Sequence, residues 1–270
     1  MARPLFTQQT SINYIFLRGK KHHTHVAGIA AGDGSLSSGL YAGVNPFANV
    51  VSVKVLDEGG RGNSGDALAG LQWVLDNAKH YNIRVANLSI GTEDTGNCDP
   101  LVRMVEALWD AGIVVVAAAG NTGPDASTVT APGNSAKIIT VGAADDDCEA
   151  SQGAVANFSG RGPTLECIVK PNILAAGCNI ISCLSNSPEM NLQRILKMHL
   201  VGKYYVKMTG TSMASPFVAG AASSLLSRFP YLSPDQVKLI LKHSAIDINL
   251  PPNRQGWGII NTKKFLNGGL

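Results

Sequence analysis

The sequence contains little charge and no signal for export. Asp, Glu, Lys and Arg together make up 15% of its 270 residues, whereas soluble proteins average about 25%. No eighteen consecutive residues are apolar, and the N-terminus lacks the apolar core of a secretory signal peptide. We therefore expect no membrane-spanning helix, no membrane partner and a cytoplasmic location.

The cysteines and the charge pattern argue against several kinds of site. The five cysteines are odd in number and lack paired metal-type spacing, so the pattern predicts neither a complete disulfide framework nor a zinc site. The net charge of +3 is small and no block of like charge occurs, which argues against nucleic-acid binding. No Asp-rich loop is convincing enough to name calcium ligands.

Strand-like and helix-like segments alternate along most of the chain. Strands are predicted at residues 49–56, 83–90, 113–118 and 137–143, and helices at 67–78 and 100–111. This alternation predicts parallel strands with crossover helices, and the length suits one large domain. The expected fold is an α/β domain with three layers, α/β/α, around a mainly parallel central sheet.

The stretch Gly210-Thr211-Ser212-Met213-Ala214-Ser215-Pro216 opens a helix rich in small residues. A serine in the first turn of a helix lies near the positive end of the macrodipole, which favours a developing alkoxide or a bound acyl group. Serine is also a preferred N-cap residue. From this stretch alone, a structural cap and a nucleophile both remain open.

Two further motifs carry candidate polar groups. His22-His23-Thr24-His25-Val26-Ala27-Gly28 predicts the start of another small-residue helix. Asn121 follows the strand at 113–118, so we expect it at the carboxyl edge of the sheet, where open α/β sheets place their sites. Its amide could donate to an oxyanion, although chemistry alone favours a turn asparagine ahead of Thr122-Gly123-Pro124.

A glycine-rich stretch supplies the main rival interpretation. Gly60-Arg61-Gly62-Asn63-Ser64-Gly65 satisfies the dinucleotide-binding fingerprint between a predicted strand and a predicted helix. Two acids, Asp57 and Glu58, precede the glycines. The next acid at a strand end, Glu93, lies 28 residues beyond Gly65 (93 − 65) rather than about 20. A nucleotide site is therefore the weakest of the hypotheses.

Taken together, the motifs resemble those of the subtilisin-like serine proteases. The stretch 210–216 is identical to the nucleophile motif of that family. Residues 22–28 resemble its His-Gly-Thr-His-Val-Ala-Gly motif, with His23 replacing glycine. Residues 118–121 resemble its Ala-Ala-Gly-Asn motif. The likeness is closest to the intracellular bacterial members. It implies an endopeptidase in which Ser212 is the nucleophile, His22 the general base and then acid, and Asn121 an oxyanion donor together with the Ser212 amide.

The same resemblance implies the substrates and the residues that contact them. Protein or peptide substrates would pair through their main chain with two exposed edges, and the chain is expected to act as a monomer. No catalytic cofactor is needed, and calcium is expected at most as a structural ion. The implied substrate-binding residues are Gly60, Arg61, Gly62, Ser89, Ile90, Gly91, Ala118, Ala119 and Gly120.

One part of the family pattern is missing. The triad of the family runs Asp, His, Ser along the chain, yet the first acid here is Asp33, which is about 16 Å along a helix from His22. We therefore expect residues 1–21 to be a non-family segment, despite a strand-like run at 12–17, and residues 22–270 to form the peptidase domain. Loss of the orienting Asp costs about 3 × 10⁴ in turnover in subtilisin, so the expected activity is impaired. The alternative is a catalytically silent pseudoprotease that binds peptides.

Overall fold

The computed structural model describes residues 13–17, 20–57, 62–92, 99–145, 155–185 and 199–269, with only the backbone described for 13–17 and 20–23. A six-stranded parallel sheet in the order β2-β1-β3-β4-β5-β6 forms its centre. The strands are β1 (Asn13–Leu17), β2 (Asn49–Val53), β3 (Ile83–Leu88), β4 (Val114–Ala118), β5 (Ile139–Ala144) and β6 (Ile173–Ala176).

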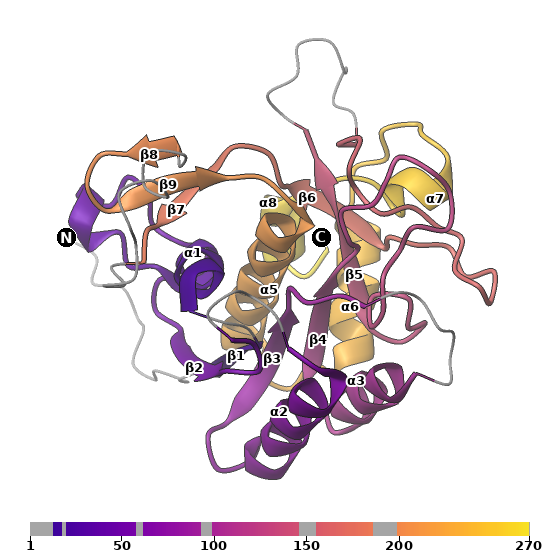
Figure 1. Ribbon diagram of the computed structural model, residues 1–270, viewed down its shortest axis with the longest axis horizontal. Coiled ribbons are helices and arrows are strands. Elements are labelled where there is room, and N and C mark those ends of the chain that lie inside the picture. The colour runs from indigo at the N-terminus through magenta and orange to yellow at the C-terminus, as the bar shows by residue number, and fades with distance from the viewer. Residues whose placement is uncertain are drawn as a thin grey trace.

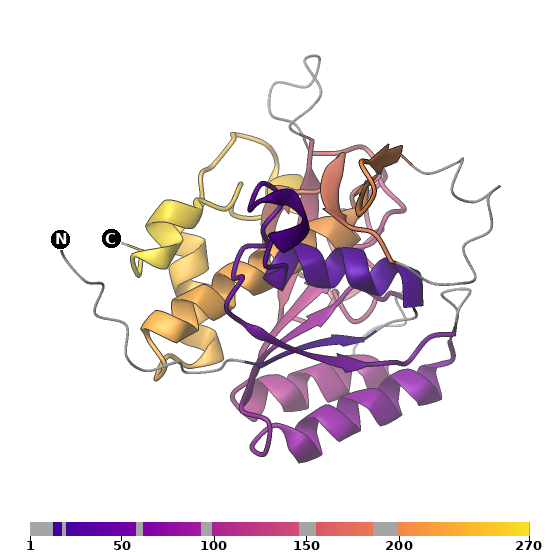
Figure 2. The ribbon, with the colours of Figure 1, turned by 90° about the vertical axis from the view of Figure 1, so that its left-hand side faces the viewer.

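Helices cover both faces of this sheet, which confirms the predicted three-layer fold (Figure 1). In Figure 2, α2 and α3 lie below the sheet and α1 and α5 above it. The helices are α1 (Lys20–Ala31), α2 (Ser64–Asn77), α3 (Pro100–Asp110), α5 (Thr211–Arg228), α6 (Pro234–Ser244), α7 (Pro252–Gln255) and α8 (Thr262–Leu266), with a 3₁₀ turn, η1, at Ser35–Ser37. None of the helices in the described part of the chain combines the length and the apolar character that a membrane crossing requires.

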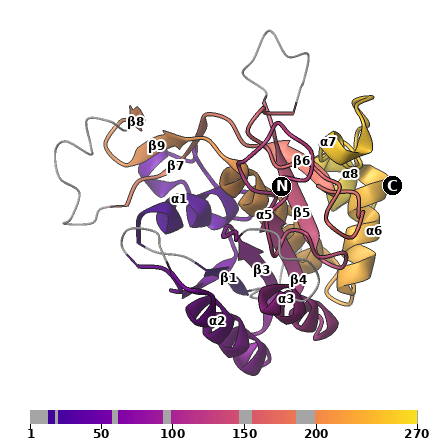
Figure 3. The same ribbon diagram turned by 45° about the vertical axis from the view of Figure 1, so that its right-hand side comes forward.

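A second, antiparallel sheet lies over α1 (Figures 1 and 3). Its strands are β7 (Ile180–Cys183), β8 (His199–Val201) and β9 (Tyr205–Met208), in the order β7-β9-β8. Strand β9 ends two residues before Gly210, so this small sheet leads directly into the start of α5.

The inner strands and α5 form the core because their residues are apolar or small. Every residue of β4 and β5 is buried, as expected for strands with helices on both faces. Helix α5 lies across β3, β4, β5 and β6 and also packs on α1. A Cβ added at Gly220 would lie 2.8 Å from Val44 Cβ and 3.1 Å from the Ala30 carbonyl oxygen, so only glycine permits this close approach of α1 and α5.

Helix caps explain where some predicted boundaries shift. Asn63 accepts a hydrogen bond from the Asp66 N–H at 2.8 Å, so α2 begins at Ser64, three residues before the predicted start. Ser233 and Gln236 form a complete capping box at the start of α6. Strands β2 and β3 end at Val53 and Leu88, earlier than the predicted ends at residues 56 and 90.

Strand β1 corrects the expectation that residues 1–21 lie outside the fold. Asn13–Leu17 pair in parallel with β2 on one side and β3 on the other. The run NYIFL is mostly apolar and aromatic, which suits an inner strand of a parallel sheet. The sheet is therefore continuous from β2 to β6, and the division of the chain at residue 22 stays a prediction for the rest of the N-terminal segment.

A fully buried lysine, Lys170, lies beside β5 and bonds to no carboxylate among the described residues. Lys170 Nζ donates to Thr140 Oγ1 at 2.7 Å, to Asn172 Oδ1 at 2.9 Å and to the Ile138 carbonyl at 3.2 Å, all neutral acceptors. Burial, and secondarily the nearby Lys238, lowers the pKa of Lys170 well below its usual value, against a smaller opposing effect of Glu106. The folded protein therefore disfavours the charged form of this amine.

Replacing Asn172 by Asp is expected to stabilise the protein. In the unfolded chain the lysine is protonated up to its ordinary pKa. At a pH below the lowered pKa of the folded state, the folded protein therefore bears the full cost of burying an ammonium. The stability rises as the pH increases from the folded pKa toward the unfolded pKa. A carboxylate at 172 would offset this cost by about 1–3 kcal/mol near pH 7, and the gain should shrink as the pH rises into that window. Urea denaturation at pH 7 and 9.5 measures this effect.

The matched control carries the same change at the surface. Asn267 is exposed and accepts from Arg228 Nη1 at 3.0 Å, so N267D should alter stability by less than about 0.5 kcal/mol. An equal urea midpoint for N172D and the parent protein at pH 7 would contradict the prediction.

Candidate active site

Ser212 is the second residue of α5 and is nearly buried, with 4% of its surface exposed. Gly210 is the N-cap residue of α5. Its φ of 153° is a conformation that favours glycine, and no side chain caps this end of the helix. The amides of a first helical turn have no acceptor within the helix. The hydroxyl and the amide of Ser212 therefore lie at the positive end of a helix of eighteen residues.

Asn121 lies beside this helix start, although it is 90 residues away along the chain. Its Oδ1 accepts from the backbone N–H of Thr211 and from Thr211 Oγ1, both at 2.9 Å. These two donors assign the orientation of the amide, and Nδ2 has no hydrogen-bond partner among the described residues. A Cβ added at Gly210 would lie 3.5 Å from that Nδ2. The structure thus brings the predicted oxyanion donor next to the predicted nucleophile.

His22 lies in the first turn of α1, where only the backbone is described. Helices α1 and α5 start on the same side of the molecule (Figure 2) and approach closely at Ala30 and Gly220. His22 precedes Ala30 by eight residues (30 − 22), and Ser212 precedes Gly220 by eight (220 − 212). Both residues are therefore about 12 Å along their helices from the same contact, at one edge of the fold.

His25 anchors α1 three residues after His22, a role that the sequence did not reveal. Its buried Nε2 lies 3.0 Å from the Ile180 carbonyl and 3.1 Å from the Val206 carbonyl, so it donates to β7 and β9, while Nδ1 has no partner among the described residues. Burial lowers the pKa of His25, against the two carbonyls that raise it. A neutral imidazole thus fixes α1 against the small sheet that leads into Ser212.

Asp33 does not replace the missing carboxylate. It follows the far end of α1 and is exposed, and its Oδ1 accepts from the Ser35 N–H at 3.0 Å and from Ser35 Oγ at 2.9 Å. These hydrogen bonds lower the pKa of Asp33. The carboxylate is thus bonded within its own turn, as its distance along the sequence predicted.

The segments predicted to bind substrate follow two paired strands. Ser89, Ile90 and Gly91 come directly after β3, and Gly120 follows β4, with Leu88 and Ala117 paired in register. The main chain of Ala119 is already bonded, because its N–H donates to Val141 and its carbonyl accepts from Thr130. Ala118 and Ala119 are also buried, so their part in the site is to shape it.

Thr130 occupies the space between these two segments, and no pattern in the sequence identified it. A Cβ added at Gly91 would lie 2.6 Å from Thr130 Oγ1, and one added at Gly120 would lie 2.8 Å from the same oxygen. The threonine side chain therefore limits the space between the two predicted substrate segments.

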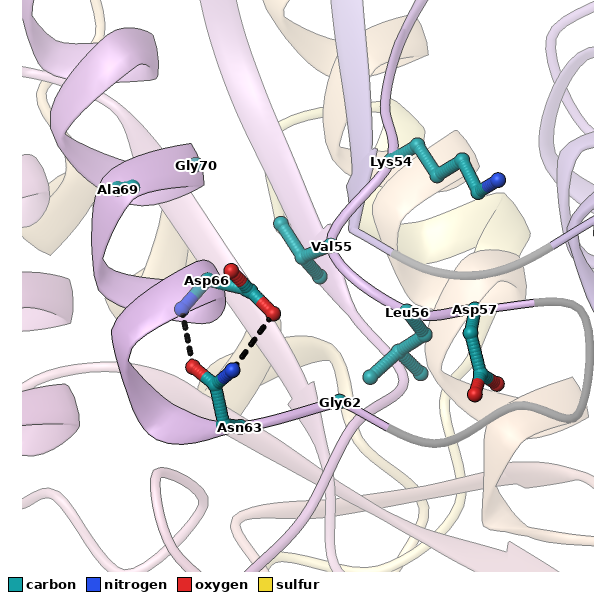
Figure 4. A pocket seen from close by; sticks show the side chains of 9 residues that line it. All are labelled: Lys54, Val55, Leu56, Asp57, Gly62, Asn63, Asp66, Ala69 and Gly70. Atoms are coloured by element: carbon teal, nitrogen blue, oxygen red, sulfur yellow. Dashed lines mark hydrogen bonds between the residues drawn. The ribbon is translucent and has the colours of Figure 1, made fainter.

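A cavity of about 710 Å³ lies between the carboxyl end of β2 and the start of α2 (Figure 4). Gly62 lines it, whereas Gly60 and Arg61 lie outside the described residues. Asp57 and Asp66 both contribute to its lining, and Asp66 Oδ2 accepts from Asn63 Nδ2 at 2.9 Å. Two carboxylates at the expected pyrophosphate position oppose an anionic ligand, which argues against the nucleotide hypothesis. The complete lining is Lys54, Val55, Leu56, Asp57, Gly62, Asn63, Asp66, Ala69 and Gly70.

Metal binding has no candidate in the described part of the chain. No group of three or more His, Cys, Asp and Glu side chains there could hold a metal ion. Calcium as a structural ion stays a prediction.

Comparisons with known proteins agree on one family. A model of the subtilase family, peptidase S8, matches residues 9–258, a range that includes β1. Serine protease AprX of Bacillus subtilis (strain 168) is 44% identical over 261 residues, which cover 92% of this chain and 58% of that protein. Subtilisin DY of Bacillus licheniformis is 32% identical over 247 residues, which cover 91% of this chain and 77% of that protein.

Solved structures share the fold at lower sequence identity. The prenylagaramide maturation protease PagA superposes with a TM-score of 0.75 at 23% identity, and the superposition covers 96% of this chain and 93% of that one. Sphericase superposes with a TM-score of 0.74 at 23% identity, and the superposition covers 94% of each chain. The chain spans somewhat more than half of AprX, at 58% of its length. By the family model and by these relatives, the chain belongs to the subtilase family, peptidase S8.

Proposed function

We propose that the chain is a serine endopeptidase domain that hydrolyses peptide bonds through an acyl-enzyme. Ser212 is the nucleophile, His22 the general base and then acid, and the Asn121 amide with the Ser212 N–H forms the oxyanion hole. The observation that carries this proposal is the hydrogen bonding of Asn121 Oδ1 to Thr211, which turns Nδ2 away from Thr211 and leaves it available as a donor within the described part of the chain.

The proposed roles lead to acyl transfer in two steps. Ser212 Oγ attacks the peptide carbonyl while its proton passes to His22, and the developing oxyanion accepts from Asn121 Nδ2 and the Ser212 N–H. His22 then protonates the leaving amine, and water repeats the sequence to release the acid. The positive end of α5 stabilises the negative charge in both steps.

Substrates are proposed to be proteins or peptides in extended conformation. The main chain after β3 offers an edge for pairing with such a chain, and Gly60, Arg61 and Gly62 are proposed as a further edge. Ala118, Ala119 and Gly120 are proposed to shape the site, because the main chain of Ala119 is already hydrogen-bonded. A cytoplasmic monomer that binds neither nucleic acid nor membrane, with calcium only as an optional structural ion, completes the proposal.

A fluorophosphonate probe tests the activated nucleophile. The folded protein is expected to label at Ser212, and S212A is expected not to label. The second candidate is a silent peptide-binding pseudoprotease, favoured by His23, which stands within the histidine motif where the family has glycine. Absence of labelling in folded protein that still binds an extended peptide would support that alternative.

Replacing Thr130 by Gly is expected to widen the preference for the residue before the cleaved bond. Removing this side chain opens the space between Gly91 and Gly120, and one methylene-sized change in a pocket alters selectivity about 10- to 200-fold. The ratio of kcat/KM for Phe over Ala at that position should rise by at least about tenfold. Kinetics with paired peptide substrates measure the ratio.

The control, T122A, changes a second threonine in the loop after β4. Thr122 Oγ1 donates to the Thr128 carbonyl at 3.1 Å and is exposed, so T122A should leave the Phe/Ala ratio unchanged. If T130G leaves that ratio unchanged too, Thr130 does not limit the space between the two predicted substrate segments.

A further inference from the structure

Three buried polar side chains connect β3 to the first turn of α5. Asn87 is 1% exposed, Ser89 2% and Ser215 0%. Asn87 belongs to β3, Ser89 follows its carboxyl end, and Ser215 lies one turn beyond Thr211 in α5. The proposed mechanism assigns no role to these side chains.

The Ser89 hydroxyl is the centre of this cluster. It accepts from Asn87 Nδ2 at 3.0 Å, lies 2.9 Å from Ser215 Oγ and 3.4 Å from the backbone carbonyl oxygen of Ser212. A serine hydroxyl has one proton to donate. It therefore donates to Ser215 Oγ or to the Ser212 carbonyl, and with either acceptor it joins the end of β3 to the turn that carries the nucleophile.

Asn121 secures the same turn from the neighbouring strand. It follows β4 and binds the N–H and the hydroxyl of Thr211. The turn around Ser212 is thus held by β4 through Thr211 and by β3 through Ser89. A first helical turn has no intrahelical acceptors for its amides and is otherwise prone to fray.

We propose that Ser89 is a positioning residue for the nucleophile, an inference that rests on the proposed function. Its hydroxyl holds the first turn of α5 against β3, so that Ser212 Oγ stays aligned with the general base and the oxyanion donors. A displacement of about 1 Å at a reacting group costs on the order of 10² in rate. Loss of the hydroxyl should therefore lower the rate of acylation and leave substrate binding nearly unchanged.

The test compares S89A with a matched control on the same helix. Ser223 is buried in α5, its Oγ lies 2.6 Å from Asn45 Nδ2, and it is eleven residues from the nucleophile (223 − 212). S89A is expected to reduce kcat and the rate of fluorophosphonate labelling at least tenfold with KM within twofold, whereas S223A changes neither rate by more than twofold. S89T, which keeps a hydroxyl, is expected to restore most of the rate.

Amide hydrogen exchange supplies a readout that does not depend on activity. Residues 211–215 should exchange faster in S89A than in the parent protein and in S223A. Equal exchange in S89A and the parent, or an equal loss of rate in S89A and S223A, would overturn the inference. Failure of the proposed function is distinguishable, because the parent protein itself would then remain unlabelled.

Discussion

An aspartate introduced at position 16 of β1 is expected to raise catalytic activity by up to about 10⁴, the factor lost when the orienting carboxylate of a Ser-His-Asp triad is removed. Phe16 pairs in register with Asn87 of β3. The Asn87 side chain bonds to Ser89 Oγ, beside α5. Residues paired in register share a face of the sheet, so a carboxylate at 16 would lie on the face that α1 and α5 cover.

Position 17 supplies the matched control for this variant. Successive residues of a strand point to opposite faces, so L17D introduces the same charge away from α1 and should bring no gain. A carboxylate that becomes buried in a sheet costs several kcal/mol, so rates should be taken per folded protein, with the folded fraction measured by urea denaturation. A folded F16D protein that labels with fluorophosphonate no faster than the parent would contradict the expectation that a carboxylate at position 16 assists the general base.

Replacing Asn121 by Asp is expected to lower kcat by about 10²–10³, a range measured for the corresponding oxyanion donor in subtilisin itself. The aspartate oxygen can still accept from the Thr211 N–H and hydroxyl, as Asn121 Oδ1 does. Only the donor toward the oxyanion is lost, and it is replaced by a negative charge. The stability of the helix start should therefore be kept while turnover falls, which steady-state kinetics and thermal unfolding together measure.

Two comparisons make the result for Asn121 specific. N157D places the same charge change on an exposed residue of a nearby loop and should leave kcat within about twofold, as surface changes commonly do. N121A removes both the donor and the acceptor, so it should lower kcat and also loosen the Thr211 turn. A kcat for N121D equal to that of N157D would remove Asn121 from the proposed oxyanion hole.

Sequence patterns predicted most of the fold because local signals and burial agreed. The apolar run ending at Ala118 became a fully buried strand, and the small residues after Ser212 became the helix that packs across the sheet. Boundaries were less accurate where a side-chain hydrogen bond starts an element, as Asn63 does for α2. The largest error concerned Asn13–Leu17, since the missing family motif concealed a run whose composition suits an inner strand.

The family and the candidate groups could be recognised from the chain alone, because they depend on which residues occur and in which order. Which of these groups meet became clear from the folded molecule. The hydrogen bond of Asn121 to Thr211, the place of Thr130 between Gly91 and Gly120, and the Ser89 cluster all join positions far apart along the chain. Such contacts depend on how strands and helices pack around a shared core, and no local pattern of residues encodes them.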